Sequence, residues 1–119
     1  MKKLDPAFKE RWVKALRSGR YRQVNAHLRG IDPDTGKLGY CCLGVACNIT
    51  NRNKWKTSPP GGGEVSEAWD WDWVRSSTSS SVIFDNLFGI DEKAVSLLMG
   101  MNDHGKPFDE IADWIEDNL

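Results

Sequence analysis

The segment Gly39-Tyr40-Cys41-Cys42-Leu43-Gly44-Val45-Ala46-Cys47 lies within the longest uncharged stretch of the chain, residues 38–51. Its aliphatic residues and cysteines suit a short, largely buried helix that begins near Cys41 and ends near Thr50. Free cysteine is among the most buried residue types, so three thiols fit a core better than a surface. The stretch contains glycines and has polar ends, so it cannot span a bilayer and we expect no membrane association.

A basic amphipathic helix is predicted near the N-terminus. Asp5 followed by Pro6 is a typical helix start, and Ser18-Gly19 is a typical end. Between them, residues recurring at helical spacing form one apolar stripe, namely Phe8, Trp12, Val13 and Leu16.

A short β-hairpin is predicted between this helix and the cysteine segment. Residues 21–29 read as extended, and residues 37–40 are expected to return as a second strand. The intervening turn is Ile31-Asp32-Pro33-Asp34-Thr35-Gly36, in which Pro presets φ, Asp caps the local backbone and Gly accepts positive φ.

The second half is predicted to be irregular and then helical. Residues 51–81 are rich in Trp, Ser and Gly, and we expect a long loop region there. Within it, the alternation of Trp and Asp over residues 69–73 is consistent with a strand edge or a loop. Two antiparallel helices then form an αα-hairpin, the first capped by Asp91 and the second opened by Pro107. Their expected apolar faces are Ala94, Val95, Leu97, Leu98 and Met101 in the first, and Phe108, Ile111, Ala112, Ile115 and Leu119 in the second.

These elements predict the fold class. A chain of 119 residues fits one domain, over residues 1–119. We predict a small α+β domain with an N-terminal helix, a short β-hairpin, a buried Cys-bearing helix, a long irregular region and a C-terminal αα-hairpin.

The formal net charge of −1 hides a division between the two halves. Residues 1–56 carry 13 Lys and Arg against 4 Asp and Glu, a net of +9, whereas residues 57–119 carry 3 against 13, a net of −10. A basic first half can attract anions, unless the two halves pack face to face. Both arrangements stay open from the sequence.

The cysteines offer one candidate catalytic centre. The dipole at a helix start stabilises a thiolate, so Cys41 or Cys42 can be read as the nucleophile of a hydrolase or transferase. Such an enzyme needs a histidine base, and the chain has two, His27 and His104. Neither lies in the strand context that cysteine hydrolases use. We therefore interpret the cysteines as core residues and keep a cysteine-dependent enzyme as an alternative.

Two metal-site patterns are incomplete. Asp32, Asp34 and Gly36 have the spacing of the start of a calcium loop, but the rest of that loop, including its terminal bidentate Glu, is missing. The Cys-Cys-x4-Cys spacing of residues 41–47 is not a standard zinc pattern. We predict no metal and no cofactor.

Basic and aromatic residues form the candidate binding set. Arg and Lys bind phosphate, and Trp and Tyr stack on bases. Six tryptophans exceed what a small core needs, so we expect some of them on a surface or in a pocket. The candidate ligand-binding residues are Arg17, Arg20, Tyr21, Arg22, Arg29, Lys54, Trp55, Trp69, Trp71 and Trp73.

The last helix is strongly acidic. This charge repels phosphates, so we do not expect the terminal helix pair to read DNA. The helix can instead dock on a basic partner or mimic nucleic acid. Its acidic residues are Asp109, Glu110, Asp113, Glu116 and Asp117.

Three segments together resemble a family of small phage- and prophage-encoded proteins. They are Trp12-Val13-x-Ala15-Leu16-Arg17-Ser18-Gly19-x-Tyr21, Tyr40-Cys41-Cys42-Leu43-Gly44-Val45-Ala46-Cys47, and Met101-Asn102-Asp103-x-Gly105-x-x-Phe108-x-Glu110-Ile111-Ala112-Asp113-x-Ile115-Glu116. The resemblance implies a phage accessory setting, in which compact chains often block or sequester host defence components. This chain has Lys106-Pro107 where the family usually has Ser at the start of the last helix, a difference that affects capping.

We therefore favour a non-catalytic phage accessory protein with a counter-defence role. It is expected to capture an anionic, nucleotide-like ligand or a host defence protein in the cytoplasm of the host bacterial cell, where free cysteines are stable. Nucleic acid as a partner and a homo-oligomeric state are left open. The alternatives are a cysteine-dependent hydrolase or transferase that uses Cys41 or Cys42, and an acidic-helix inhibitor or nucleic-acid mimic.

Overall fold

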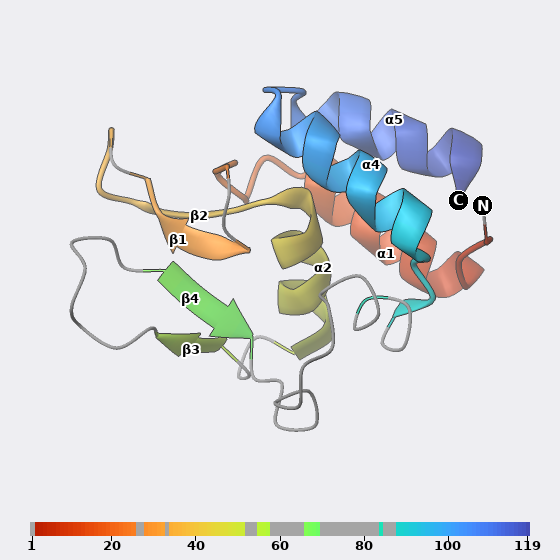
Figure 1. The fold of residues 1–119 in the computed structure, drawn as a ribbon, viewed down its shortest axis with the longest axis horizontal. Coiled ribbons are helices and arrows are strands. Elements are labelled where there is room, and N and C mark those ends of the chain that lie inside the picture. The colour runs from red at the N-terminus through yellow and green to blue at the C-terminus, as the bar shows by residue number, and fades with distance from the viewer. Residues whose placement is uncertain are drawn as a thin grey trace.

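Helices and a sheet occupy opposite ends of the molecule in a computed structural model, which describes residues 2–25, 28–32, 34–51, 55–57, 66–69, 84 and 88–119 (Figure 1). In chain order the elements are α1 (Pro6–Arg17), β1 (Arg29–Ile31), β2 (Leu38–Tyr40), α2 (Cys42–Asn51), β3 (Trp55–Thr57), β4 (Ser66–Trp69), α4 (Glu92–Asp103) and α5 (Phe108–Asn118). The predicted α+β class is confirmed.

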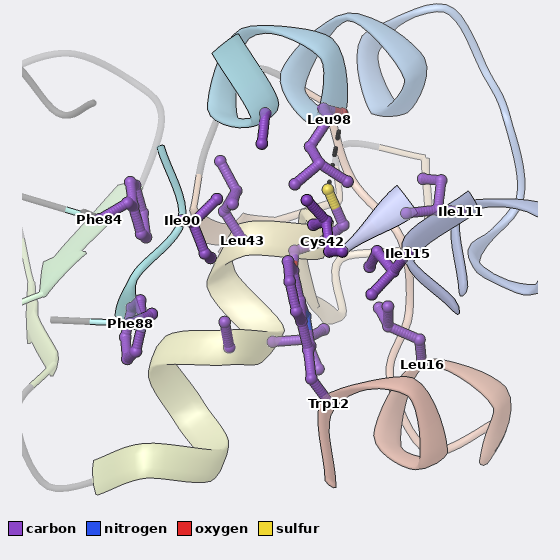
Figure 2. Close-up of a cluster of buried hydrophobic side chains, with 14 of the residues drawn as sticks. Trp12, Leu16, Cys42, Leu43, Phe84, Phe88, Ile90, Leu98, Ile111 and Ile115 are labelled. Atoms are coloured by element: carbon purple, nitrogen blue, oxygen red, sulfur yellow. Dashed lines mark hydrogen bonds between the residues drawn. The ribbon is translucent and has the colours of Figure 1, made fainter. Parts of the chain in front are cut away.

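Helix α2 lies between the sheet and the layer formed by α1, α4 and α5 (Figure 1). Its side chains Cys42, Val45 and Cys47 are completely buried. Figure 2 shows Cys42 and Leu43 among side chains that come from all three neighbouring helices. The predicted buried, Cys-bearing helix is therefore confirmed.

The ends of α1 are those that the sequence predicts. The Asp5 carboxylate accepts a hydrogen bond from the backbone N–H of Phe8 at 3.1 Å, and Pro6 is the first helical residue. The chain leaves the helix through Gly19, whose φ of 74° suits glycine. The buried Trp12 donates its indole N–H to the Cys42 carbonyl at 3.0 Å and so joins α1 to α2.

The sheet is antiparallel, with strand order β2-β1-β4-β3. Strands β1 and β2 form the predicted hairpin, and Gly36 takes the expected positive φ of 70° in its turn. The predicted bounds of the first strand are wrong, because β1 covers Arg29–Ile31 and not residues 21–29. On the other side of β2, Tyr40 N–H donates to the Arg22 carbonyl at 2.7 Å, and Val24 N–H donates to the Tyr40 carbonyl at 2.9 Å. Residues 22–24 are thereby held along the edge of the sheet.

The prediction that residues 51–81 are irregular is wrong at two places. Strands β3 and β4 lie inside this range, and β4 pairs with β1 as well as with β3. Strands of three and four residues are too short to show a clear alternation of apolar and polar side chains, and the pairing of β4 with β1 joins segments that are distant in sequence. Residues 58–65 and 70–83 lie outside the described residues.

The C-terminal αα-hairpin is confirmed. Asp91 accepts from Ala94 N–H at 2.8 Å at the start of α4, and Gly105 turns the chain toward α5 with a φ of 86°. Every residue predicted for the apolar face of α5 is buried. On α4 the prediction fails at Leu97, which is 42% exposed, because the buried positions of this helix are Ala94, Val95, Leu98 and Asn102.

The two ends of the described chain meet beside α4 and α5 (Figure 1). The backbone N–H of Leu4 donates to the Leu119 carbonyl at 2.9 Å. Lys2 N–H donates to the Asp91 carboxylate at 2.9 Å, which lowers the pKa of Asp91. Among the described helices, none has both the length and the apolar character needed to cross a membrane.

Candidate anion-binding site

Two hollows lie side by side where α1 ends and the chain turns toward the sheet. The first has a volume of about 590 Å³ and is lined by Arg11, Lys14, Ala15, Ser18, Arg20, Tyr21 and Ile49. The second has a volume of about 580 Å³ and is lined by Gly19, Arg20, Tyr21, Arg22, Gln23, Asp32, Lys37 and Leu38. Because Arg20 and Tyr21 line both, we treat the two hollows as one candidate site.

Helix α1 supplies two of the three cations of the first hollow, Arg11 and Lys14. Arg11, Lys14 and Ser18 are spaced by three and four residues, so they share one face of the helix. Trp12 and Leu16 point from the same helix into the core (Figure 2). The Arg11 guanidinium donates to the Ile49 carbonyl at 2.6 Å, in the last turn of α2, which fixes it at the edge of the hollow.

The turn after α1 places Arg20 at the junction of the hollows. The Ser18 hydroxyl donates to the Ala15 carbonyl at 2.6 Å and accepts from the Arg20 backbone N–H at 3.2 Å. Gly19, with its positive φ, then redirects the chain toward β2. The Arg20 backbone N–H is thus tied to the end of α1, whereas the Arg20 side chain is exposed.

Tyr21 is held from two directions. Its ring meets the Tyr40 ring edge to face, with centroids 5.0 Å apart, and its hydroxyl accepts from the Asn48 side-chain amide at 3.0 Å. The ring is half-buried, so part of its surface remains available at the hollows. A ring fixed in this way loses little conformational entropy when a ligand packs against it.

The second hollow combines three cations with one carboxylate. The Arg22 guanidinium lies 3.8 Å from the Asp32 carboxylate. Lys37, on the hairpin, lines the same hollow and is exposed. The Asp32 carboxylate also accepts from Asp34 N–H at 3.0 Å and from the Thr35 hydroxyl at 3.2 Å, so it is engaged in its own turn. With Arg20, Arg22 and Lys37 against Asp32, the lining of this hollow carries a net positive charge.

The structure brings together three of the predicted binding residues, Arg20, Tyr21 and Arg22. Arg29 lies on β1 with its guanidinium 5.8 Å from the centre of the Tyr40 ring and lines neither hollow. The backbones of Trp55 and Trp69 lie opposite each other in the β3–β4 pair. Outside the described residues lie Lys54, Trp71, Trp73 and His27.

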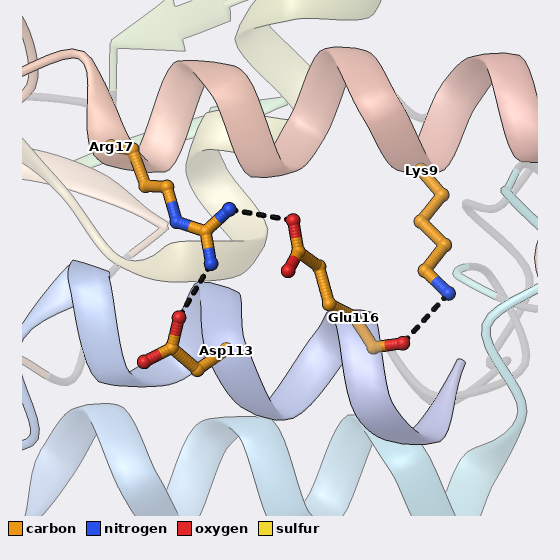
Figure 3. Close-up of polar contacts among 4 residues, drawn as sticks. All are labelled: Lys9, Arg17, Asp113 and Glu116. Atoms are coloured by element: carbon orange, nitrogen blue, oxygen red, sulfur yellow. Dashed lines mark hydrogen bonds and ion pairs between the residues drawn. The ribbon is translucent and has the colours of Figure 1, made fainter.

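Arg17 requires a correction, because it faces α5 rather than the hollows. Its guanidinium bonds to Asp113 and to Glu116, each at 2.5 Å (Figure 3). These bonds raise the pKa of Arg17, and the pKa of Glu116 is lowered by the same contact. Lys9 donates to the Glu116 carbonyl at 3.0 Å. Along this seam the basic and acidic halves do pack face to face.

Sequence reasoning missed Arg11, Lys14 and Lys37 as members of the site. A usable signal was present for the first two, since their helical spacing places them opposite the apolar stripe of α1. Lys37 had no such signal, because its position depends on how the hairpin folds beside residues 20–22.

The cysteines are buried core residues. Burial raises the pKa of Cys41 to about 11 and the pKa values of Cys42 and Cys47 well above 9.0. The Cys42 thiol donates to the Leu98 carbonyl at 3.6 Å (Figure 2), and the Cys41 sulfur accepts from Gly44 N–H at 3.4 Å. A thiolate nucleophile needs a low pKa and access, and this arrangement supplies neither. His104 is exposed at the end of α4.

Comparison with known proteins gives a family. Residues 4–119 match the family described as a domain of unknown function (DUF8296). The chain belongs to this family. No curated protein and no solved structure matches it.

Across the described parts of this DUF8296 chain, no group of three or more His, Cys, Asp or Glu residues is placed to hold a metal ion. Among the described residues, the candidate site gathers cations around Arg20 and the fixed ring of Tyr21. Its chemistry suits phosphate or carboxylate groups, which arginine binds through paired N–H donors.

Proposed function

We propose that this DUF8296 protein binds an anionic, nucleotide-like ligand at the hollows that Arg20 and Tyr21 share. The observation that supports the proposal most is the convergence of Arg11, Lys14 and Arg20 beside a fixed tyrosine ring. Among the described residues that line this first hollow, none is acidic. A concave surface with one sign of charge concentrates anions and increases their rate of association.

The residues have distinct roles in this proposal. Arg20 presents a planar guanidinium that can hold two oxygens of a phosphate, and Lys14 adds a point charge. Tyr21 offers its ring for stacking, since its hydroxyl is already bonded to Asn48 at 3.0 Å.

The resemblance to small phage- and prophage-encoded proteins supports a biological setting for this site. In that setting the protein is an accessory factor in the host cytoplasm that captures a nucleotide-like signal or a component of host defence. A counter-defence role of this kind follows from sequestration alone and requires no chemistry at the cysteines.

Calorimetry and thermal shift against cyclic dinucleotides, ADP-ribose derivatives and short oligonucleotides test the proposal. We expect at least one of these anions to bind, and Arg20→Ala to weaken that binding about 10-fold to 100-fold, as the loss of a charge-assisted hydrogen bond predicts. Lys93→Glu is the matched control, because Lys93 is exposed on α4 and lines neither hollow. If none of these anions binds, the proposal is wrong.

A second candidate is a docking role for α5. Three carboxylates on α5 stay largely exposed in spite of the contacts with α1 and Lys106: Asp113 at 68%, Glu110 at 58% and Glu116 at 48%. A basic partner can bind this face, and its capture in a salt-sensitive pull-down, lost on charge reversal of Asp109, Asp113 and Asp117, would favour this function.

A further inference from the structure

The cations around the two hollows form a strip with the aromatic ring at its middle. Arg11 and Lys14 lie at one end, in the first hollow only, and Arg22 and Lys37 lie at the other end, in the second hollow only. Each hollow alone has the volume of a small-molecule site, and the two extend in different directions from Arg20 and Tyr21, which they share. The strip is therefore suited to a ligand longer than one nucleotide.

The lining of the second hollow is unlike that of a site for a compact small molecule. Such sites are mostly apolar, with a few polar groups that fix orientation. In the second hollow Leu38 is the one aliphatic lining residue beside four charged ones, whereas the first hollow sets its three cations beside Ala15, Ile49 and the Tyr21 ring. Repeated phosphate contacts, rather than burial of apolar area, would have to supply the affinity.

One aromatic ring between two groups of cations matches the chemistry of an unpaired strand. Proteins that bind single strands combine a positive groove along the backbone with side chains on which bases stack. The bases of a duplex are already stacked and paired, so the fixed Tyr21 ring offers them no platform.

We infer that the ligand is a single-stranded nucleic acid whose backbone crosses both hollows and whose base stacks on Tyr21, an inference that rests on the proposed anion-binding function. The phosphates on one side of the stacked base contact Lys14 and Arg11. Those on the other side contact Arg22 and Lys37, with Arg20 between the two groups.

A length series tests the inference directly. Thymidine 3′,5′-bisphosphate, oligo-dT of two, four and eight nucleotides, and the matching oligo-U strands are titrated into the full chain at several salt concentrations. Affinity should rise with length until both hollows are spanned and then level off near four nucleotides, the lower end of known single-strand site sizes, about 4–16. The slope of log K against log salt should steepen by about 0.7 for each added phosphate contact.

Variants at the two ends of the strip separate the hollows. Both Lys14 and Lys37 are exposed, so charge reversal there should leave the fold intact. We expect Lys14→Glu and Lys37→Glu each to weaken eight-nucleotide strands at least 10-fold. Each should weaken the bisphosphate less, because the bisphosphate carries a single phosphate on each side of its base, and Lys93→Glu should weaken neither ligand.

The outcomes distinguish failure of the single-strand inference from failure of the proposed anion site. If the bisphosphate binds as tightly as the eight-nucleotide strand, or if a duplex of the same length binds more tightly than the strand, the inference is overturned while the proposed anion site stands. If Lys14→Glu and Lys37→Glu leave the affinity for the strand unchanged, the inference is also overturned. If no anion binds, both the inference and the proposed function fail. Binding of oligo-dT or of oligo-U with the expected variant pattern supports the inference, and the difference between them reports on the 2′-hydroxyl.

Discussion

The side-chain oxygen of Asn102, on α4, accepts a hydrogen bond from the backbone N–H of Cys42, in the first turn of α2, at 3.1 Å. The same oxygen accepts from the Gln23 amide at 2.9 Å, and the Asn102 amide donates to the Val24 carbonyl at 2.8 Å. Asn102 is fully buried. One side chain thus fixes the segment that follows Arg20 and Tyr21 against the core, so the geometry of the candidate site depends on it.

Replacement of Asn102 by leucine, Asn102→Leu, should destabilise the fold by about 2–4 kcal/mol. The substitution keeps the volume but leaves the buried Cys42 N–H and the partly buried Val24 carbonyl without these partners, and each such group costs about 1–3 kcal/mol when it is cut off from water. Urea denaturation measures the effect. Ser96→Ala, at an exposed position of the same helix, should change stability by less than about 0.5 kcal/mol. An unchanged midpoint for Asn102→Leu would contradict the role assigned to this network.

Gly44→Ala and Gly100→Ala should have opposite effects. A Cβ at Gly44 would lie 1.7 Å from the Leu28 carbonyl oxygen, which is backbone and cannot yield cheaply, whereas a Cβ at Gly100 would meet nothing within 4 Å. We expect Gly44→Ala to unfold the protein or cost more than about 4 kcal/mol. Gly100→Ala should stabilise it by about 0.5–1 kcal/mol, the usual gain for alanine within a helix. Thermal denaturation of both variants checks the pair, and equal effects would be inconsistent with the close approach at Gly44.

The sequence predicts the helices well because their signals are local. Asp5-Pro6 and Asp91 mark helix starts through caps, and the apolar spacing of the α5 residues gives its buried face directly. The paired strands β3 and β4 were missed, since β4 is held by β1, which is distant in the chain, and β3 is held by β4. Nothing around Asn102 indicates that its amide is buried, because its partners come from residues 23–24 and from α2.

The candidate site is predicted only in part for the same reason. Arg20, Tyr21 and Arg22 are adjacent in sequence, so any turn that exposes one brings the others near it. Composition alone could not show that Arg11 lines the hollow whereas Arg17 contacts α5. That distinction requires knowing which face of α1 meets α5.

The cysteine thiols should react slowly with thiol reagents in the folded protein. They should also make the free energy of unfolding decrease at alkaline pH. Burial raises the pKa of Cys41 to about 11 from 9.0, so between these values the unfolded chain loses a proton that the folded chain keeps. The contribution of such a thiol to the free energy of unfolding is therefore fully present below about pH 9. It falls as the pH rises toward 11, by about 1.4 kcal/mol per pH unit for each such thiol.

Urea midpoints between pH 7 and pH 10 measure this dependence. Cys42→Ala should show a shallower decline above pH 9, because one buried thiol fewer titrates on unfolding. Labelling with a thiol reagent at pH 8 should be slow without urea and complete in urea. Rapid labelling of the native protein would contradict the buried placement and would revive the cysteine-dependent alternative.

Arg17→Ala and Arg20→Ala should separate stability from binding. Arg17 is joined to Asp113 and Glu116 across the α1–α5 seam, and its side chain is 36% exposed (Figure 3). Partly exposed ion pairs stabilise proteins only weakly and are screened by salt. Arg17→Ala should therefore lower the urea midpoint slightly, more at low salt than at high salt, and should leave anion binding unchanged. Arg20→Ala should leave the urea midpoint unchanged and weaken anion binding. If Arg17→Ala weakened binding as much as Arg20→Ala did, the assignment of Arg17 to the seam alone would be wrong, and the binding surface would have to extend onto α5.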